Sequence, residues 1–526
     1  MKIKIFVQVL QLADIFLRCM VKRQGVATAL LLLAVVTGGQ TKRGDLSDKP
    51  FDTLLSQQAK LVANDGVAGD NFGAKVAISG NLAVVANPSN AGGPGSAYIY
   101  SRSGTTWTRQ AKLRPSEVTF DDFFGCSVAI SGSTAVVGAC NALVGSNQHQ
   151  GRVYIFTKAQ IGTAWNQVAA LTASDGTANA YFGYSVAISG SLTIVGAIGA
   201  APGVGAAYVF AGALNAWSEE QKLTDPIGSS SPNAGLGLSV GISGSTAVVG
   251  APQGCEDTLC FTKSGTALVF LRTGNSWSLQ SRLSALDTGS GSIAHGGFGA
   301  SAAISGETIV IGSYFETANP PPLQAAITVF VRNGSNWAPQ QVMRANDPHG
   351  FGLDVAIAGD AIAVGSRSPD RSTLERAYIF TRSGTHWDQQ DDLTANDGES
   401  GDSFGGTVSI SGTTVIVGAP RDDIGVNQNQ GSAYVFDITA TSVSISGRVT
   451  QSSSSGRSVT NATLNISDGS GYSQSTKTDR DGNYQFSNVP GSRSYTVTVT
   501  QRRFHFSPQG VSTTGNVTSL NFVGTP

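Results

Sequence analysis

Pairs of aspartates in the loops of this sequence are the first residues whose spacing could do chemistry. Asp65 with Asp70 in "ANDGVAGDNFG", and Asp397 with Asp402 in "ANDGESGDSFG", offer carboxylate oxygens that could share a hard cation such as calcium. The related loop "ASDGTANAYFG" keeps only the first aspartate, Asp175. Because Asn-Asp-Gly is also favourable turn chemistry, we interpret these residues first as turn formers and keep calcium as the alternative.

Charged residues in two further loops are candidate ligand-binding groups. Both loops lie between apolar, strand-like segments, and together they contribute Arg367, Asp370, Arg371, Arg421, Asp422 and Asp423. A solvated rim is the alternative interpretation, because surface loops carry charge whether or not they bind a ligand.

Catalytic chemistry is not predicted. The five histidines are scattered and share no partner spacing: His149, His295, His349, His386 and His505. The sequence has neither a phosphate-binding Gly-Lys-Ser/Thr loop nor a His-Glu-x-x-His zinc motif. We therefore predict a protein without catalytic residues or cofactor. An active site assembled from distant segments is the alternative.

Four cysteines after the leader form two local pairs, Cys126 with Cys140 and Cys255 with Cys260. Each pair predicts an intrachain disulfide if the protein reaches an oxidising compartment. A zinc site is the weaker interpretation, because no histidine lies beside either pair and four-cysteine sites favour tighter spacing.

The first fifty residues indicate export. In "MVKRQGVATALLLLAVVTGGQ" (20–40), a basic start precedes an apolar run and then small residues, which is the order of a secretory signal peptide. We interpret residues 1–39 as a signal peptide or leader, with a possible start at Met20; an uncleaved anchor is the alternative. We expect residues 40–50 to be disordered and the mature chain, secreted or at the cell surface, to lack a membrane span.

Composition narrows the class of protein. Charged residues make up 13% of the 526 residues and the formal net charge is −1, so no basic surface for nucleic acid is expected. Glycine is abundant, with 65 residues scattered among apolar doublets, which indicates an all-β chain with many tight turns.

A repeat about fifty residues long organises most of the chain. Each copy begins with Phe-Gly, or once Leu-Gly, and a second glycine follows the first by seven residues, as in "FGCSVAISG". The alternation of apolar residues between the glycines predicts a strand with one buried face. A third strand reads like "AYVF", and a fourth begins at a tryptophan in six copies, where we expect the tryptophans to be core residues.

Four antiparallel strands repeated seven times predict a seven-bladed β-propeller over residues 51–437. A solenoid is the competing architecture, but its end repeats should be atypical. Seven first strands accompany only six tryptophan strands. In the segment 54–61, "LLSQQAKL", Leu55 takes the tryptophan position and Leu61 follows six residues on, as in "WTRQAKL" (107–113). We therefore expect the N-terminal segment to complete the last blade and close the ring.

These residues resemble the FG-GAP repeats of the integrin α-subunit propeller, and more closely the exported bacterial variety with "VAISG" and "VVGAP" patterns. The resemblance implies a propeller that recognises a ligand. Integrin-type repeats often carry an Asp-x-Asp-x-Asp-Gly calcium loop between the first two strands, whereas this chain has short "SGN", "SGS" or "SGT" turns there. Calcium sites of that kind are therefore not expected.

Past residue 441 the repeat ends. Residues 442–526 are rich in serine and threonine, alternate like strands, and contain an Asp-Gly hairpin signal in "TKTDRDGNYQFSNVP". This stretch resembles a carboxypeptidase-regulatory-like or Cna-B-type β-sandwich, a module that serves as a spacer or adhesive unit.

The combined interpretation is an exported, non-catalytic binding or adhesion protein. We expect its partner to be a protein or glycan recognised through the propeller face that carries the second-to-third-strand loops. An extracellular hydrolase or lyase with a site in the central depression is the alternative, and a structural surface-layer component is a third possibility.

Overall fold

The computed structural model describes most of the chain after the leader. The described residues are 56–88, 93–115, 117–200, 203–213, 216–226, 234–254, 265–285, 294–313, 315–317, 325–345, 350–366, 374–438, 442–451, 456–467, 473–490, 494–512 and 517–525. The predicted leader (1–39), the segment 40–50 and the first residues of the predicted closing strand lie outside them.

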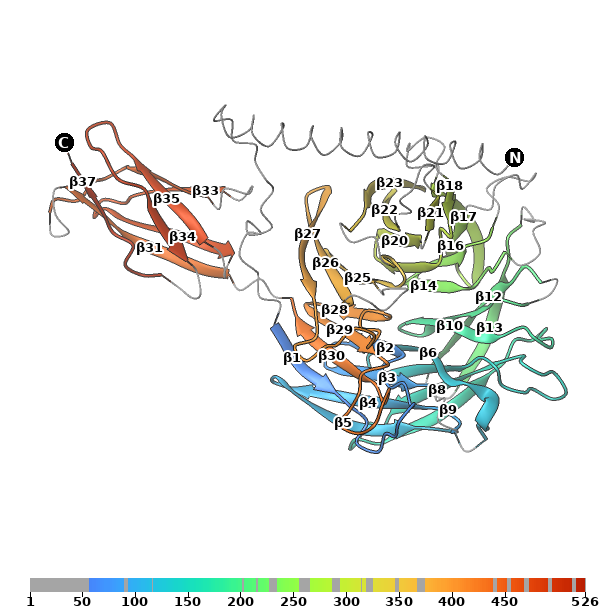
Figure 1. The fold of residues 1–526 in the computed structure, drawn as a ribbon. Helices are drawn as coiled ribbons and strands as arrows, with labels where there is room; N and C mark the ends of the chain where they lie inside the picture. The colour runs from blue at the N-terminus through green and yellow to red at the C-terminus, as the bar shows by residue number, and fades with distance from the viewer. Residues whose placement is uncertain are drawn as a thin grey trace, which may run out of the picture.

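Seven four-stranded antiparallel sheets, here called blades 1 to 7, form from the described residues up to Asp437 (Figure 1). Blade 1 contains β2 (Lys75–Ser79), β3 (Leu82–Asn87), β4 (Ser96–Ser103) and β5 (Thr106–Leu113). Blade 2 contains β6 (Phe124–Ser131), β7 (Thr134–Ala139), β8 (Arg152–Lys158) and β9 (Trp165–Leu171). Blade 3 contains β10 (Phe182–Ser189), β11 (Leu192–Ala197), β12 (Ala206–Ala213) and β13 (Ala216–Leu223). Blade 4 contains β14 (Ser239–Ser243), β15 (Thr246–Ala251), β16 (Thr266–Thr273) and β17 (Ser276–Leu283).

Blades 5 to 7 repeat this plan. Blade 5 contains β19 (Ser301–Ser305), β20 (Thr308–Ser313), β22 (Ala326–Asn333) and β23 (Asn336–Met343). Blade 6 contains β24 (Val355–Ala358), β25 (Ala361–Ser366), β26 (Arg376–Ser383) and β27 (His386–Leu393). Blade 7 contains β28 (Val408–Ser411), β29 (Thr414–Ala419), β30 (Ser432–Asp437) and, from the N-terminal end of the described chain, β1 (Ser56–Leu61). A short 3-10 helix, η1 (Phe120–Asp122), precedes blade 2.

The innermost strands of successive blades contact one another around a ring. β2 contacts β6, β6 contacts β10, and the series continues through β14, β19, β24 and β28 back to β2. A ring of radially arranged four-stranded sheets is a β-propeller. The predicted all-β class, with repeated four-stranded sheets followed by a sandwich, is confirmed.

β1 supplies the outermost strand of blade 7. It pairs with β30 in the antiparallel register Leu61↔Ala433, with a bulge between Gln57 and Ala59. Leu61 is buried and packs in the same core cluster as Phe72 of blade 1 and Ile416 of blade 7. The chain therefore joins its first and last blades through side-chain burial as well as backbone hydrogen bonds.

The phenylalanine of each Phe-Gly pair is a core residue between blades. Phe72 lies edge-to-face against Tyr98, with ring centroids 5.4 Å apart, and Phe182 lies in the same way against Tyr208 at 5.6 Å.

The tryptophans divide into two groups. Those of blades 4, 5 and 6 are buried, whereas those of blades 1, 2 and 3 are half-buried and pack at the edges of clusters.

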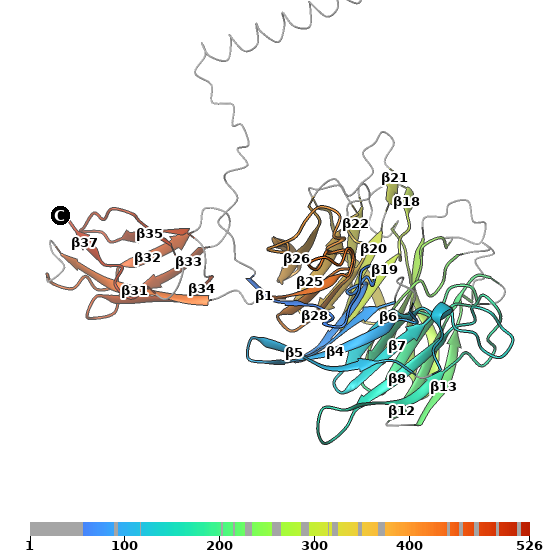
Figure 2. The same cartoon turned by 60° about the horizontal axis from the view of Figure 1, so that its bottom comes forward.

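A two-stranded ribbon stands out from blade 5 (Figure 2). It consists of β18 (Ala294–Gly296) and β21 (Phe315–Thr317), which are antiparallel. The segment before blade 5 and the second-to-third-strand connection of the same blade are therefore paired with each other.

The C-terminal residues form a separate β-sandwich. Its sheets are β34–β31–β37 and β33–β32–β35–β36. The strands are β31 (Ser442–Gln451), β32 (Thr463–Ser467), β33 (Ser473–Lys477), β34 (Asn483–Pro490), β35 (Ser494–Thr500), β36 (Gln509–Ser512) and β37 (Phe522–Gly524). Alternate residues face a core that includes Ile445, Leu464, Phe486 and Val497. The Asp-Gly hairpin prediction is wrong: the turn joins β33 and β34, which lie in different sheets and do not pair with each other. Asp479 accepts the Asn483 amide in this turn at 2.8 Å.

Candidate functional site

The strand order gives the propeller two unlike faces. Because consecutive strands are antiparallel, the first-to-second and third-to-fourth connections lie at one end of each blade, and the second-to-third and blade-to-blade connections lie at the other. The first end carries tight turns with left-handed glycines such as Gly80 (φ 56°) and Gly132 (φ 53°), and we call it the turn face. The other end carries the long, variable segments, and we call it the loop face.

Three arginines near the turn face pack against the fold. Arginine side chains lie over tryptophan rings in three blades, with Arg102 5.7 Å from Trp107, Arg332 4.6 Å from Trp337 and Arg382 5.1 Å from Trp387. Asp360 pairs with Arg382 at 2.5 Å, and Glu307 pairs with Arg332. Each of these arginines therefore has an aromatic partner within the propeller, and Arg332 and Arg382 also have an acidic one.

Serines of the "ISG" turns link the blades at the turn end. The hydroxyl of one blade accepts the glycine amide of the next, as Ser79 does from Gly132 at 3.0 Å and Ser189 from Gly244 at 3.1 Å. The same bond is found at six of the seven blade junctions. At the seventh, between blades 6 and 7, Ala358 occupies the serine position. The recurring serine is therefore a structural residue.

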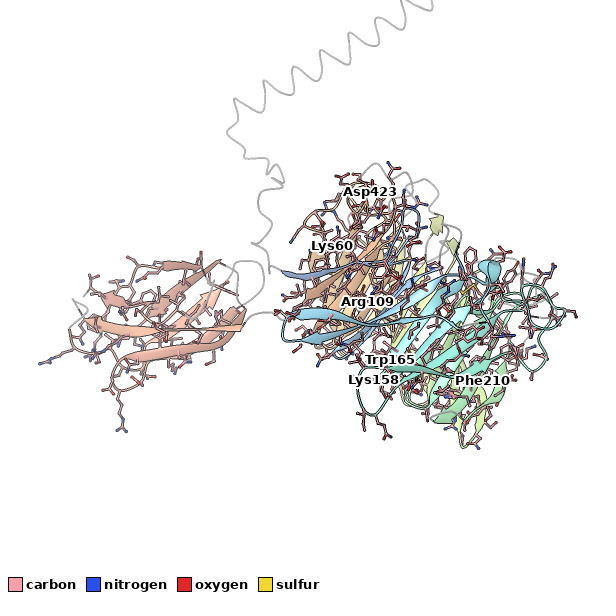
Figure 3. All side chains as sticks on the ribbon, turned by 90° about the horizontal axis from the view of Figure 1, so that it is seen from below. Lys60, Arg109, Lys158, Trp165, Phe210 and Asp423 are labelled. Carbon is pink, nitrogen blue, oxygen red and sulfur yellow. A yellow bond between two sulfur atoms is a disulfide. The ribbon has the colours of Figure 1, made fainter. Side chains whose placement is uncertain are left out.

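Exposed apolar side chains gather on the loop face. Eight large hydrophobic residues of the described propeller are exposed, and seven lie in loop-face segments or, for Tyr184, near the loop-face end of β10: Val67, Phe123, Leu143, Tyr184, Leu353, Leu374 and Val426. The eighth, Ile161, lies in the turn-face connection between Lys158 and Trp165, the two residues that Figure 3 labels at its ends. Apolar surface concentrated on one face is typical of an interaction site.

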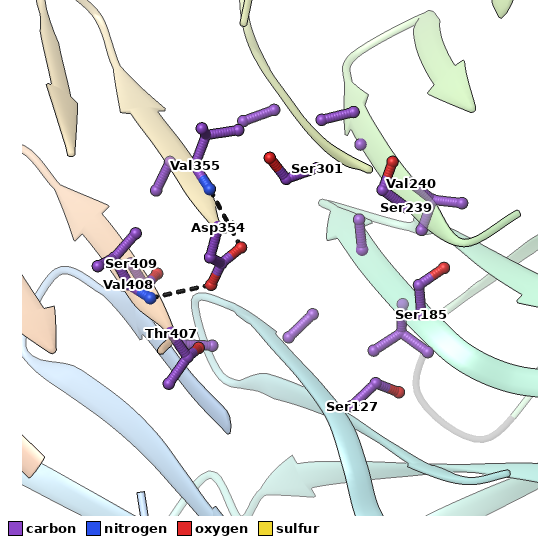
Figure 4. A pocket seen from close by; sticks show the side chains of 18 of the residues that line it. Ser127, Ser185, Ser239, Val240, Ser301, Asp354, Val355, Thr407, Val408 and Ser409 are labelled. Carbon is purple, nitrogen blue, oxygen red and sulfur yellow. Dashed lines mark hydrogen bonds between the residues drawn. The ribbon is translucent and has the colours of Figure 1, made fainter. Parts of the chain in front are cut away.

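A central channel of about 350 Å³ runs along the innermost strands. Near its loop-face end, one position of each blade forms a polar ring (Figure 4). Four members are serines, and each donates its hydroxyl to the carbonyl of the glycine in the next blade's Phe-Gly or Leu-Gly pair: Ser127, Ser185, Ser239 and Ser301. The remaining three are Lys75, Asp354 and Thr407. The serines hold the ring together, Lys75 and Asp354 give it charge, and Thr407 adds a neutral hydroxyl.

Asp354 accepts hydrogen bonds from the backbone amides of Val408, at 2.9 Å, and Val355, at 3.1 Å (Figure 4). Burial raises the pKa of Asp354 above its ordinary value, and the charge of Lys75, the Val408 amide and the Thr407 hydroxyl offset part of the rise. Lys75, Tyr184 and Asp354 are the titratable residues that line the described channel. They do not form the nucleophile-and-base arrangement that covalent catalysis needs.

Two loops of the loop face, in blades 2 and 7, share an ordered structure. In each, an asparagine donates to a glutamine three residues later, Asn147 to Gln150 at 2.8 Å and Asn427 to Gln430 at 2.7 Å. The loops also pair with the segment entering the next blade, as Phe72 does in donating its amide to the Gln430 carbonyl at 2.8 Å. The repeated "NQ-x-QG" in "VGSNQHQG" and "IGVNQNQG" is the sequence signal for this structure, and our sequence analysis missed it.

The predicted aspartate pairs have partners within the protein. Asp65 contacts Lys112 at 2.8 Å and Arg109 at 2.5 Å, and Asp397 contacts Lys60 at 2.7 Å. Lys60 and Arg109 lie on the outermost strands of neighbouring blades (Figure 3). Partial burial opposes ionisation, but these cations outweigh it and hold the pKa of Asp65 and of Asp397 below the usual range.

Asp70 and Asp402, the second members of the pairs, cap turns. Asp70 accepts the Val67 amide at 2.9 Å and Asp402 accepts the Glu399 amide at 2.7 Å. Burial, and then the nearby carboxylates Asp422, Glu399 and Asp423, raise the pKa of Asp402. Asp70 and Asp402 thus act as turn caps in this structure, and a shared calcium ion stays the alternative. Within the described ranges, no cluster of three or more His, Cys, Asp or Glu side chains has a metal-binding arrangement.

The predicted charged loop of blade 7 is largely occupied by its own fold. Asp422 is buried and accepts hydrogen bonds from Ser432 at 2.5 Å and Tyr434 at 2.8 Å, with Lys60 2.8 Å away. Asp423 accepts the Asn429 amide at 2.7 Å, and Arg421 donates its amide to the Asp402 carbonyl at 3.0 Å. Asp422 therefore anchors the loop. The companion candidates Arg367, Asp370 and Arg371 lie outside the described residues.

Cys126 on β6 and Cys140 after β7 are placed as a disulfide pair, with Cα atoms 6.4 Å apart. This separation lies within the range that disulfides span. Cys255 and Cys260 lie outside the described residues, and their pairing stays a prediction.

The motif Gly-x-Ser-x-Gly occurs at residues 237–241 and 401–405, and our sequence analysis missed both. In the first, the Ser239 hydroxyl donates to the Gly299 carbonyl. Ser403 resembles an activated serine in two respects: its backbone is left-handed (φ 59°) and its buried hydroxyl has no hydrogen-bond partner among the described residues. The hydrolase motif, however, places its serine between a strand and a helix beside a histidine. Here β28 follows, and the described surroundings of the hydroxyl supply no base. The geometry does not support a nucleophile.

Family models match both parts of the chain. The FG-GAP repeat model matches residues 55–100, 107–156, 165–210 and 387–436. The carboxypeptidase regulatory-like domain model matches residues 444–524. Each FG-GAP match begins in an outermost strand and ends in the third strand of the next blade, so the repeat spans a blade junction. No curated protein matches the chain.

Proposed function

Because this chain contains FG-GAP repeats and a carboxypeptidase regulatory-like domain, we propose that it is a non-catalytic binding protein of the cell surface or extracellular space. Neither family is catalytic. In this proposal the propeller recognises a protein or glycan ligand through its loop face, and the sandwich acts as a spacer or second adhesive module. No helix long and apolar enough to cross a bilayer occurs in the described part of the chain.

The distribution of exposed apolar side chains carries the proposal. Seven of the eight exposed large hydrophobic residues of the described propeller are on the loop face, although both faces belong to the same repeats. Exposed apolar area is unfavourable in water by roughly 25 cal/mol per Å², so a partner that covers it gains affinity. The ordered loops of blades 2 and 7 hold part of this surface in place, because Leu143 and Val426 are exposed on them.

A matched pair of substitutions tests the proposal. Val426 on the loop face is 95% exposed and Ile161 on the turn face is 91% exposed, so an aspartate at either position should be tolerated by the fold. The full-length protein and the variants Leu143→Asp/Val426→Asp and Ile161→Asp are applied to protein and glycan arrays, with thermal melts as a control.

We expect saturable binding to weaken at least tenfold in the loop-face variant and to stay unchanged in Ile161→Asp. Equal loss in both variants, or no saturable ligand on either array, contradicts loop-face recognition. Turnover of an arrayed glycan would instead favour the extracellular hydrolase or lyase alternative.

A further inference from the structure

One position of the loop face is left-handed in all seven blades. It is the residue before the Phe-Gly or Leu-Gly pair: Asn71 (φ 56°), Phe123 (56°), Tyr181 (53°), Gly235 (70°), Gly297 (80°), Gly350 (64°) and Ser403 (59°). Glycine adopts this conformation freely and asparagine tolerates it, whereas a bulky aromatic residue is strained by it. Blades 2 and 3 thus place aromatic rings where blades 1, 4, 5 and 6 use asparagine or glycine and blade 7 uses a serine.

Tyr181 is held in this strained conformation by its surroundings. Its amide donates to the His149 carbonyl at 3.0 Å, and its own carbonyl accepts the Tyr184 amide at 3.1 Å. The rings of His149 and Tyr181 lie 5.8 Å apart. In proteins, backbone strain that the surrounding structure maintains is concentrated at functional positions. Tyr181 is therefore a candidate functional residue.

Tyr181 lines a second cavity, of about 320 Å³, between blades 3 and 4. The other described lining residues are Ile198, Gly199, Gly235, Leu238, Pro252 and Gln253. Leu238 also lines the central channel, so the cavity lies beside the channel's loop-face end. Its volume is within the range of small-ligand sites and can hold one large side chain.

The cavity depends on the contrast between two equivalent positions. Blade 3 supplies a tyrosine from the left-handed position, and blade 4 supplies Gly235 from the same position. A Cβ atom at Gly235 would lie 3.7 Å from the nearest atom of Pro252, in ordinary contact, so a side chain there would extend into the cavity. The glycine leaves the space open and the tyrosine borders it.

The chemistry of the lining selects the occupant. None of the described lining residues is an acid or a base that is ionised at neutral pH, so a charged group would lose its hydration without a counter-ion. A sugar ring carries several hydroxyls, each needing a partner, and the described lining side chains offer only the Gln253 amide and the Tyr181 hydroxyl. An apolar side chain needs no such partner, and anchors of this kind dominate protein interfaces.

We propose that this cavity receives an uncharged aromatic or aliphatic side chain of a protein partner, with Tyr181 as the contacting residue. The inference rests on the proposed loop-face binding and narrows its ligand class to protein. Tyr184, which is 40% exposed, follows in β10 and lines the neighbouring central channel.

The test uses the full-length protein and three small probes in ligand-detected NMR titrations. N-acetyl-phenylalaninamide represents the proposed occupant, N-acetyl-phenylalanine adds a negative charge, and methyl β-glucoside represents a sugar. We expect saturable binding of the amide at millimolar concentration, at least tenfold weaker binding of the charged probe, and none of the glucoside.

Two variants assign the binding to the cavity. Tyr181→Asn inserts the residue that blade 1 has at this position, and should weaken amide binding at least fivefold while the melting temperature stays the same or rises. Gly235→Phe fills the cavity and should abolish binding. Gly350→Phe is its matched control, because it creates the same backbone strain in blade 6 and should leave binding intact.

Several outcomes overturn the proposal. They are glucoside binding in place of the amide, no amide binding at 20 mM, or amide binding that survives both Tyr181→Asn and Gly235→Phe. A drop in melting temperature of Tyr181→Asn with unchanged binding makes the tyrosine structural and has the same consequence. If array ligands still bind through the loop face in Tyr181→Asn, the proposed function stands and only this cavity assignment fails.

Discussion

The turn face and the loop face are built from the same seven repeats but differ in regularity. At the turn end, one serine–glycine bond recurs at every described junction except that after Ala358. At the loop end, the equivalent serine–carbonyl bond is present at four junctions, and Lys75, Asp354 and Thr407 replace it at the others. The turn end is therefore held by one repeated hydrogen bond. At the loop end, a similar hydrogen bond alternates with side chains of different chemistry at the equivalent position.

Exposed surface follows the same division. Three arginines near the turn face lie on tryptophan rings, whereas the loop face exposes apolar residues that the fold does not cover. A protein that needed only a stable ring could have two similar faces. The difference between them separates residues that hold the blades together from residues that are free to contact a partner.

The largest expected effect comes from deleting β1, the strand that closes the ring and supports both faces. Deletion of residues 51–61 opens blade 7, exposes the edge of β30 and removes the buried Leu61 and the Lys60 contacts with Asp397 and Asp422. We expect the melting temperature to fall by about 10 °C or more in a cooperative transition. Differential scanning calorimetry measures this.

Leu61→Ala is the matched point variant for this deletion. It leaves the strand in place but removes a buried side chain, so it should destabilise the propeller by about 3 kcal/mol, less than the deletion does. An unchanged melt in the deletion variant would show that β1 does not hold the ring closed.

The next largest effect is a difference in stability between alanine substitutions at two glycines of the same loop, Gly151 at its base and Gly145 at its tip. Gly151 has φ 88°, and an added Cβ would lie 2.0 Å from the Phe182 carbonyl oxygen of the next blade. Gly145, at the tip of the same loop, has φ 60° and open space around it. We expect Gly151→Ala to cost about 3 kcal/mol or more of unfolding free energy and Gly145→Ala about 1 kcal/mol, measured by urea denaturation. Similar losses at both positions would mean that the loop tip is as constrained as its base.

Much of the architecture could be predicted because the repeat fixes local geometry. The seven-residue interval between glycines, as from Gly125 to Gly132, corresponds to one inner strand and its turn, and the likeness of "QQAKL" to "RQAKL" located β1. These signals depend on neighbours in sequence. A strand's alternation and a turn's glycine are visible without knowing what lies beside them in space.

The candidate site was harder to predict because its properties arise between blades. Asp65 is paired by Lys112 of the next outer strand, and no spacing in the sequence reveals that contact. Tyr181 precedes Phe-Gly like any loop residue, and its left-handed backbone is imposed by pairing with the loop that carries His149. Asp354 stands at a position that reads only as the start of a strand, so its place in the channel ring was not expected.

The smallest expected effect concerns that residue and depends on pH. Because burial raises the pKa of Asp354 in the folded state, the native protein binds a proton more readily there than the unfolded chain does. The contribution of this group to stability is therefore full below the unfolded pKa of an aspartate, and it is lost as pH rises through the folded pKa. Asp354→Asn keeps an oxygen that accepts the Val408 amide but removes the charge, so it should stabilise the protein at pH 7 by about 1 kcal/mol. The gain should shrink toward zero near pH 3, where the wild-type carboxyl is already neutral.

Urea titrations of both proteins at several pH values measure this, with Asp65→Asn as the contrasting variant. Cations lower the pKa of Asp65, so its replacement should destabilise the protein at pH 7. If Asp354→Asn is instead destabilising at neutral pH, the charge of Asp354 supports the ring together with Lys75, and the loop end of the channel is framework like the turn end.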